Sequence, residues 1–166
     1  MTSVAPILEH FSPASGSVSA VAAALRTAGY RVCSLEDLDR STEAPPPTGG
    51  TLEEVLDALV AANPGYRWRR SKGGLVEVAP LESVLDESAT ADDWPSLVAE
   101  LERHAVTLFQ ELSGPTPDVQ LPADAATVRG LLNAAALGLG PTAAWHVSGT
   151  SGAWFLTFVG AEIGRA

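Results

Sequence analysis

The sequence predicts an α+β fold built from two related halves, in which amphipathic helices pack on small mixed sheets. Three observations support this prediction. Apolar residues recur at helical spacing in several segments, short segments rich in β-branched and aromatic residues follow them, and one helix-plus-hairpin pattern occurs twice. We expect residues 1–82 to form the first half and residues 83–166 the second, with the two packed as one unit.

Composition places the chain among globular proteins and limits its partners. Its 166 residues are 46% hydrophobic and 18% charged, enough apolar material for a buried core without disulfides. The formal net charge of −10 repels nucleic-acid phosphates, so nucleic acid is not an expected partner. No apolar run has the length of a membrane span, so membrane insertion is not expected. Cys33, the single cysteine, lies in an apolar segment and is expected to be buried.

The first half begins with a predicted strand, helix and strand. The short apolar stretch at residues 6–11 is expected to form an edge strand. Residues 17–28 carry apolar side chains at helical spacing behind the capping residue Ser17, and residues 30–35 then read as a strand. Residues 36–50 are acidic and then rich in proline and glycine, which predicts a surface loop.

The second helix has a clear start signal at Thr51. Thr51 and Glu54 have the spacing of a capping box, and an apolar stripe follows until the sequence Asn-Pro-Gly ends the helix. Two short segments, residues 66–70 and 75–79, then flank a turn that contains glycine. This arrangement predicts a β-hairpin.

The second half is expected to open with a connector and the longest helix of the chain. That helix runs over residues 94–112, with Asp93 as its cap and Pro95 in its first turn. Apolar residues at steps of three and four along one face support the full length. The sequence DVQLP, residues 118–122, predicts a strand.

A second copy of the helix-plus-hairpin pattern starts at Thr127. The helix ends at the sequence LGLGP, and residues 143–147 predict a strand, residues 148–152 a turn and residues 153–159 the returning strand. Aligning Thr51 with Thr127 brings Trp68 to Trp145 with a one-residue gap. We therefore predict a duplicated unit in which the two tryptophans occupy equivalent positions and the helical stripes, which include Leu56 and Leu132, are buried.

Residues 51–80 resemble the second half of the short N-terminal domain shared by secretins and TonB-dependent receptors (STN domain). Their sequence is TLEEVLDALVAANPGYRWRRSKGGLVEVAP. In that family a T-L-x-x-[AV]-L-x-x-L helix precedes a hairpin. The preceding residues, SVSAVAAALRTAGYRV, are similar to the first helix and strand of that domain, so the resemblance covers residues 15–80. Part of the pattern is repeated in the second half of the chain, in the sequence VRGLLNAAALGLGPTAAWHV. Stand-alone bacterial proteins of unassigned role carry a similar order, ending with a T-V-R-x-L-L-N-A helix and a hairpin that contains tryptophan.

The resemblance implies a βαβ-βαβ-like fold and a role in docking or assembly at the cell envelope, without catalysis. It implies a periplasmic location if a leader peptide has been removed, and the cytoplasm is expected otherwise. The apolar stretch at residues 18–25 follows no basic residue and is a poor signal peptide.

The candidate partner-binding residues lie on the two hairpins. They are Tyr66, Arg67, Arg69, Arg70, Lys72, Trp145 and Trp154. Strand alternation directs Arg67 and Arg69 to one face and Tyr66, Trp68 and Arg70 to the other. A basic hairpin in an acidic protein is suited to a carboxylate-rich partner strand or an anionic ligand, whereas solvated charges that protect a sheet edge are the structural alternative. For the tryptophans, core packing is the alternative to a binding surface.

No catalytic, cofactor-binding or metal-binding signature is found. His10, His104 and His146 lack the spacing of a metal site, and Ala153 stands where the nucleophile-elbow pattern G-x-S-x-G requires its last glycine. The sequence LGLGP lacks the spacing of a dinucleotide-binding loop. We therefore expect a non-enzymatic protein-binding or assembly module that presents a sheet edge or hairpin to a protein partner. The alternative is a small-molecule or peptide-binding protein with a pocket between the halves, near Trp145 and Trp154.

Overall fold

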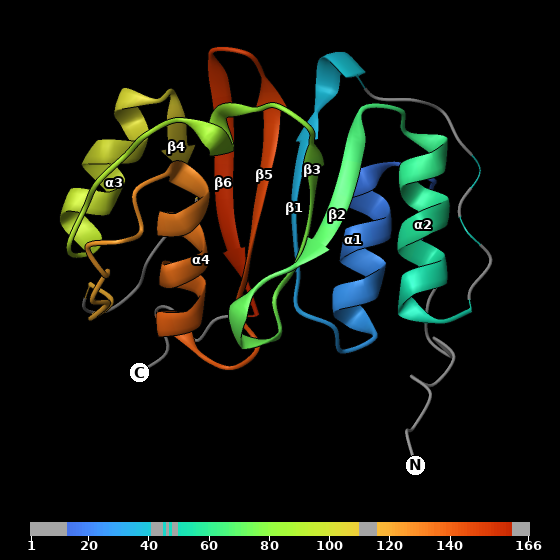
Figure 1. Cartoon of the computed structure of the whole chain (residues 1–166), viewed down its shortest axis with the longest axis horizontal. Coiled ribbons are helices and arrows are strands. Elements are labelled where there is room, and N and C mark those ends of the chain that lie inside the picture. The colour runs from blue at the N-terminus through green and yellow to red at the C-terminus, as the bar shows by residue number, and fades with distance from the viewer. Residues whose placement is uncertain (1–12, 41–44, 46, 48–49, 110–115, 161–166) are drawn as a thin grey trace. The chain divides into compact units, whose positions relative to one another are not determined.

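The structure, a computed structural model, describes residues 13–40, 45, 47, 50–109 and 116–160 (Figure 1). Within these residues it contains four α-helices and six β-strands, which confirms the predicted α+β class. The chain divides into two compact units, Met1–Leu81 and Glu82–Ala166. The edge strand predicted at residues 6–11 lies outside the described residues.

The first unit is a three-stranded sheet with two helices. Its elements follow in the order α1 (Val18–Thr27), β1 (Val32–Asp37), α2 (Leu52–Ala62), β2 (Tyr66–Arg70) and β3 (Val76–Pro80). Short 3-10 turns follow β1 at Leu38–Arg40 and join β2 to β3 at Lys72–Gly74. β3 is the middle strand, antiparallel to β2 and parallel to β1.

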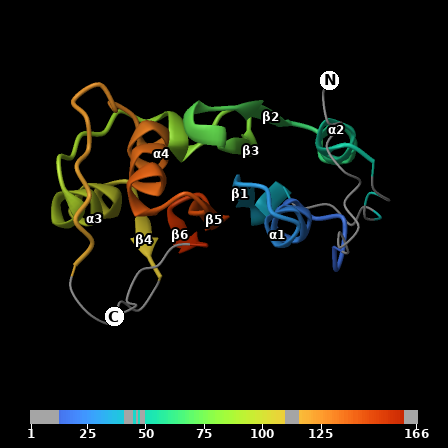
Figure 2. The ribbon, with the colours of Figure 1, turned by 90° about the horizontal axis from the view of Figure 1, so that it is seen from below.

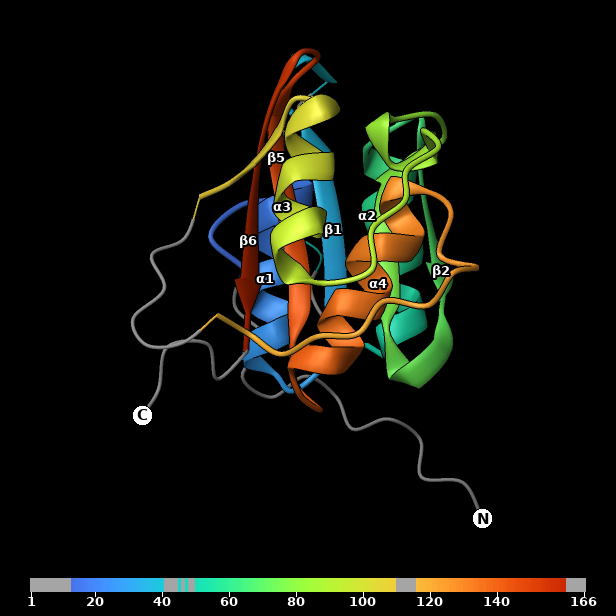
Figure 3. The same ribbon diagram turned by 90° about the vertical axis from the view of Figure 1, so that its left-hand side faces the viewer.

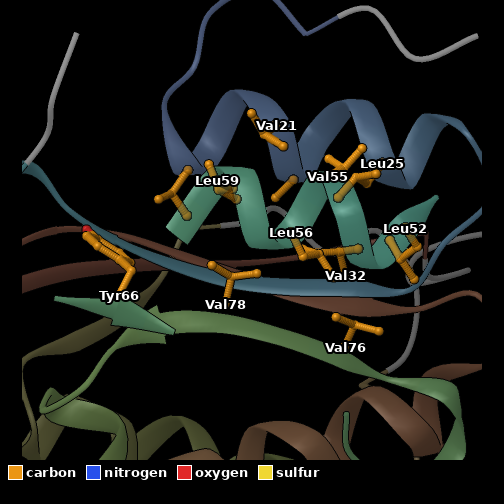
Figure 4. Packing of buried hydrophobic residues seen from close by; sticks show 12 residues of the cluster. Val21, Leu25, Val32, Leu52, Val55, Leu56, Leu59, Tyr66, Val76 and Val78 are labelled. Atoms are coloured by element: carbon orange, nitrogen blue, oxygen red, sulfur yellow. The ribbon is translucent and has the colours of Figure 1, made fainter. Parts of the chain in front are cut away.

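Both helices of the first unit begin at the predicted caps and pack on one face of its sheet. The Ser17 side chain accepts from the amide of Ala20, and Thr51 and Glu54 form the predicted capping box. Figures 1 and 2 show the two helices side by side. Figure 4 shows their apolar side chains above the strands, and the cluster they form includes Val21, Leu25, Val55, Leu56, Leu59, Val32, Val76 and Val78. Leu56 is 0% exposed, so the predicted stripe of α2 is confirmed.

The second unit repeats this plan. A 3-10 turn at Val84–Asp86 precedes α3 (Trp94–Arg103), β4 (Val106–Leu108), α4 (Val128–Leu139), β5 (Ala144–Thr150) and β6 (Ala153–Val159). The middle strand is β6, antiparallel to β5 and parallel to β4, and Figure 3 shows its hairpin with β5. Each unit therefore has the element order αβαββ with its last strand in the middle, which supports the predicted duplication.

The helix predicted over residues 94–112 is wrong in its second part, because α3 ends at Arg103. The amides of His104 and Ala105 donate to the carbonyls of Leu101 and Glu102, which closes a tight turn. Ala105 has a φ of 61°, a left-handed conformation that no helix continues through. Residues 106–108 then pair with β6, so their helix-like apolar spacing is overridden by sheet pairing.

Ala105 occupies the place in the second unit that Gly29 occupies in the first, between helix and strand. Gly29 also has a positive φ, of 103°, which glycine adopts without steric cost. We expect Ala105→Gly to stabilise the protein by about 1 kcal/mol, because the relief of backbone strain exceeds the entropic cost of glycine. Gly29→Ala should destabilise it by about the same amount, through its backbone alone, since a Cβ there meets nothing within 4 Å. Urea denaturation measures both changes, and a loss of stability in Ala105→Gly would contradict the strain.

Three further sequence predictions need correction. Residues 118–122 form no strand; the segment is irregular, and the amide of Leu121 donates to the carbonyl of Asp92 at 3.1 Å instead of to a neighbouring strand. The predicted loop at residues 36–50 begins too early, because β1 continues to Asp37. The turn predicted at residues 148–152 is shorter, since β5 extends to Thr150 and pairs with Ala153.

None of the helices in the described part of the chain combines the length and apolar character needed to cross a bilayer.

Candidate functional site

The strand β2 is the outer strand of the first unit's sheet, and β3 is its neighbour on one side (Figure 1). The Gly65 carbonyl accepts from the Leu81 amide at 2.8 Å, and the Ser71 amide donates to the Leu75 carbonyl at 2.8 Å. These two contacts mark hydrogen-bonded pairs at both ends of the β2–β3 ladder.

Hydrogen-bonded and non-hydrogen-bonded pairs alternate in an antiparallel ladder, which fixes the direction of every backbone group in β2. In the observed register, Arg67 and Arg69 form hydrogen-bonded pairs with Ala79 and Glu77. The backbone amide and carbonyl groups of Trp68 and Arg70 therefore point away from β3, toward the outer side of the strand.

The side of β2 that faces α2 carries the aromatic residues. The Trp68 indole Nε1 donates to the Asp57 carboxylate at 2.9 Å, and the Arg70 guanidinium pairs with Glu53 and lies 5.8 Å from the centre of the Trp68 ring. Trp68 is partly exposed, and Arg70 is exposed. These contacts hold the outer strand against an acidic helix.

Tyr66, at the start of β2, belongs to the core. Its hydroxyl accepts from the amide of Asp37 at 2.8 Å, and burial raises the pKa of this hydroxyl. Tyr66 is 6% exposed, so of the five hairpin candidates it is the one whose side chain offers little contact surface.

The opposite side of β2 carries basic residues. Arg69 Nη2 lies 3.4 Å from Oε1 of the buried Glu77, its cross-strand neighbour. Arg67 is exposed and pairs with no acidic side chain among the described residues, and the same holds for Lys72 in the adjoining turn. The predicted division of Arg67 and Arg69 from Tyr66, Trp68 and Arg70 agrees with these contacts.

The two tryptophan candidates of the second unit lie in its interior. Trp145 is 0% exposed and Trp154 is 6% exposed. The Trp145 Nε1 donates to Oδ1 of Asn133 at 2.7 Å. The structure thus brings Tyr66, Arg67, Arg69, Arg70 and Lys72 together on one hairpin and places Trp145 and Trp154 in the core of the other unit.

Trp68 and Trp145 make equivalent contacts in the two units. Their hydrogen-bond acceptors, Asp57 and Asn133, follow the capping residues Thr51 and Thr127 at the same interval. The two rings differ in burial and in the charge of their acceptor, since Asp57 is a surface carboxylate and Asn133 a neutral amide. The tryptophan hydrogen bond therefore lies at the surface of the first unit, whereas the equivalent bond of the second unit involves a buried ring.

Sequence reasoning missed Glu36, which the predicted loop included. Its Oε1 accepts from the amide of Ser19 in the first turn of α1 at 2.6 Å, and the side chain is 5% exposed. A carboxylate at this position provides a hydrogen-bond acceptor for an amide that has none within the helix. Its negative charge also interacts favourably with the helix dipole. No local pattern signals this contact, because it joins the end of β1 to the start of α1.

Other polar groups in the described residues take part in local structural contacts. No three metal-ligating side chains come together in that part of the chain. His104 Nδ1 lies 2.6 Å from Glu87 and its Nε2 3.7 Å from Glu100, a contact that ties the end of α3 to the preceding segment. An open hollow of about 450 Å³ beside the start of α3 is lined by Asp92, Ser96 and Leu121 among others, and Ser96 is engaged in the helix cap.

Comparison of the chain with models of known protein families, with curated proteins and with solved structures finds no significant match. The resemblance to the STN domain therefore stays a prediction.

Proposed function

We propose that the protein is a non-enzymatic docking module in which β2 accepts an extended segment of a partner protein. The observation that carries the proposal is the outward direction of the Trp68 and Arg70 backbone groups on an outer strand. An added strand forms hydrogen bonds to such groups, which is a recurrent way for proteins to bind extended peptides.

The position of β2 favours binding because the strand is already ordered. Trp68 and Arg70 are joined to Asp57 and Glu53 of α2, and Tyr66 is fixed in the core. A partner that pairs with an ordered strand loses only its own conformational freedom, so less free energy is spent on ordering.

The contrast with a protected edge also supports the proposal. Edges closed to pairing often carry a proline, a bulge, charged side chains or a strand too short to pair. In β2 the five residues pair with β3 in continuous register, and none of them is proline. The charged side chains of β2 oppose pairing with a strand of like charge but attract a strand of opposite charge, so they select among partners.

The cell envelope is the setting that we propose, on the STN resemblance of residues 15–80. Domains of that kind dock or assemble other envelope proteins, and a docking strand agrees with such a role. The proposal for β2 depends on its geometry and does not require this setting.

Two substitutions at Arg70 test strand addition. Arg70→Pro removes the outward amide, while Arg70→Ala keeps it and removes the same Glu53 ion pair. Linear peptides are selected from a displayed random library against the full chain, and their dissociation constants are measured for each variant. We expect Arg70→Pro to weaken binding about tenfold or more relative to Arg70→Ala, from one lost hydrogen bond and the perturbed edge.

Circular dichroism and thermal unfolding of both variants control for folding. A library that yields no peptide, or peptides that bind the two variants equally, would overturn the docking role of β2.

A further inference from the structure

We infer that the segment that binds β2 alternates acidic with apolar residues, an inference that rests on the docking role proposed above. Successive side chains of a bound strand point to opposite faces of the sheet. The guest strand therefore meets two chemically different environments, one on each side of β2.

The side away from α2 selects for acidic residues. Arg67 is exposed and pairs with no carboxylate among the described residues, and Arg69 is 42% exposed at its side chain although it contacts Glu77. Lys72 adds a further exposed positive charge in the turn that follows the strand. Guest carboxylates on this side gain charge-assisted hydrogen bonds to the guanidinium groups.

The geometry of pairing places those carboxylates close to the arginines. Arg67 and Arg69 use their backbone groups for β3, so opposite an antiparallel guest strand they take the non-hydrogen-bonded positions. Side chains approach each other most closely at such positions. Guest residues opposite Arg67 and Arg69 are therefore the ones whose charge matters most.

The side that faces α2 selects against acidic residues. On this side Asp57 accepts from Trp68, and Glu53 pairs with Arg70 and offsets its positive charge. The exposed Glu54 follows Glu53 in α2 and adds to the negative charge of the helix. The partly exposed ring of Trp68 provides apolar surface there. An apolar guest side chain covers this ring, whereas a carboxylate meets negative charge. Acidic and apolar residues are thus required at alternate positions, not merely in equal numbers.

Three synthetic peptides test the alternation with the full chain. The first alternates glutamate with valine, the second has the same composition with all glutamates before all valines, and the third alternates lysine with valine. Isothermal titration calorimetry measures each dissociation constant at moderate salt. We expect the first peptide to bind about tenfold tighter than the second and the third to bind weakest, since two cross-strand charge pairs distinguish them.

Charge reversal at one position identifies the basic side. Arg67→Glu should weaken the glutamate–valine peptide about tenfold and strengthen the lysine–valine peptide. Arg103→Glu is the matched control, because it changes the net charge equally but lies at the exposed end of α3, outside the β2–β3 hairpin. It should have a clearly smaller effect on both peptides.

The outcomes separate this inference from the docking role. Equal affinity for the alternating and block peptides, or equal effects of Arg67→Glu and Arg103→Glu, would overturn the alternation. The docking role would still be supported if library peptides are sensitive to Arg70→Pro. Library peptides insensitive to Arg70→Pro would remove both. Tighter binding of the alternating acidic peptide with a specific Arg67→Glu effect supports the inference.

Discussion

Replacing Trp145 by alanine is expected to lower the free energy of unfolding by about 3–5 kcal/mol, the range for a large aromatic ring removed from a core. Trp145 is 0% exposed, and its backbone lies opposite that of Phe158 in the β5–β6 ladder. Its loss leaves a cavity and also frees the side-chain amide of Asn133 from the 2.7 Å hydrogen bond. Urea denaturation followed by circular dichroism measures the change.

Trp68→Ala is the matched comparison, because Trp68 makes the equivalent contact in the first unit. Its ring is partly exposed and its acceptor Asp57 is a surface carboxylate, so we expect a smaller loss, of about 1–2 kcal/mol. Equal losses in the two variants would contradict the difference in burial. Such a result would place both rings in the same environment and remove Trp68 from the docking surface.

Glu36→Ala is expected to destabilise the protein by about 2–3 kcal/mol, the range for a lost hydrogen bond to a charged group at a buried position. The carboxylate accepts from the Ser19 amide at 2.6 Å and is 5% exposed. Its removal leaves that amide without its acceptor and the start of α1 without a compensating charge. Hydrogen exchange at Ser19 should accelerate more than at the end of α1.

Two further variants define the cause of the Glu36 effect. Glu36→Gln keeps an acceptor and loses the charge, so it should cost less, about 1 kcal/mol. Glu53→Ala removes a carboxylate from an exposed ion pair with Arg70 and should cost no more than about 1 kcal/mol. A Glu36→Ala variant as stable as Glu53→Ala would show that the carboxylate does not hold the helix.

Local sequence determined where helices begin and where the hairpins lie. The capping box of Thr51 and Glu54, the cap at Ser17 and the alternation of Arg67 with Trp68 involve residues a few positions apart. Interactions of this kind are formed within one element, so their residue spacing predicts them. The candidate hairpin was predictable for the same reason.

Only the tertiary structure decided the features that join distant parts of the chain. Residues 106–108 leave the helical pattern because β6, far along the sequence, offers them a strand to pair with. Glu36 accepts from the Ser19 amide in the first turn of α1 because β1 ends beside the start of that helix. The burial of Trp145 but not Trp68, and the outward backbone of β2, likewise depend on which elements surround them. The burial of a side chain and the pairing of a strand depend on residues that are close in space but distant in sequence. A local sequence pattern does not identify those residues.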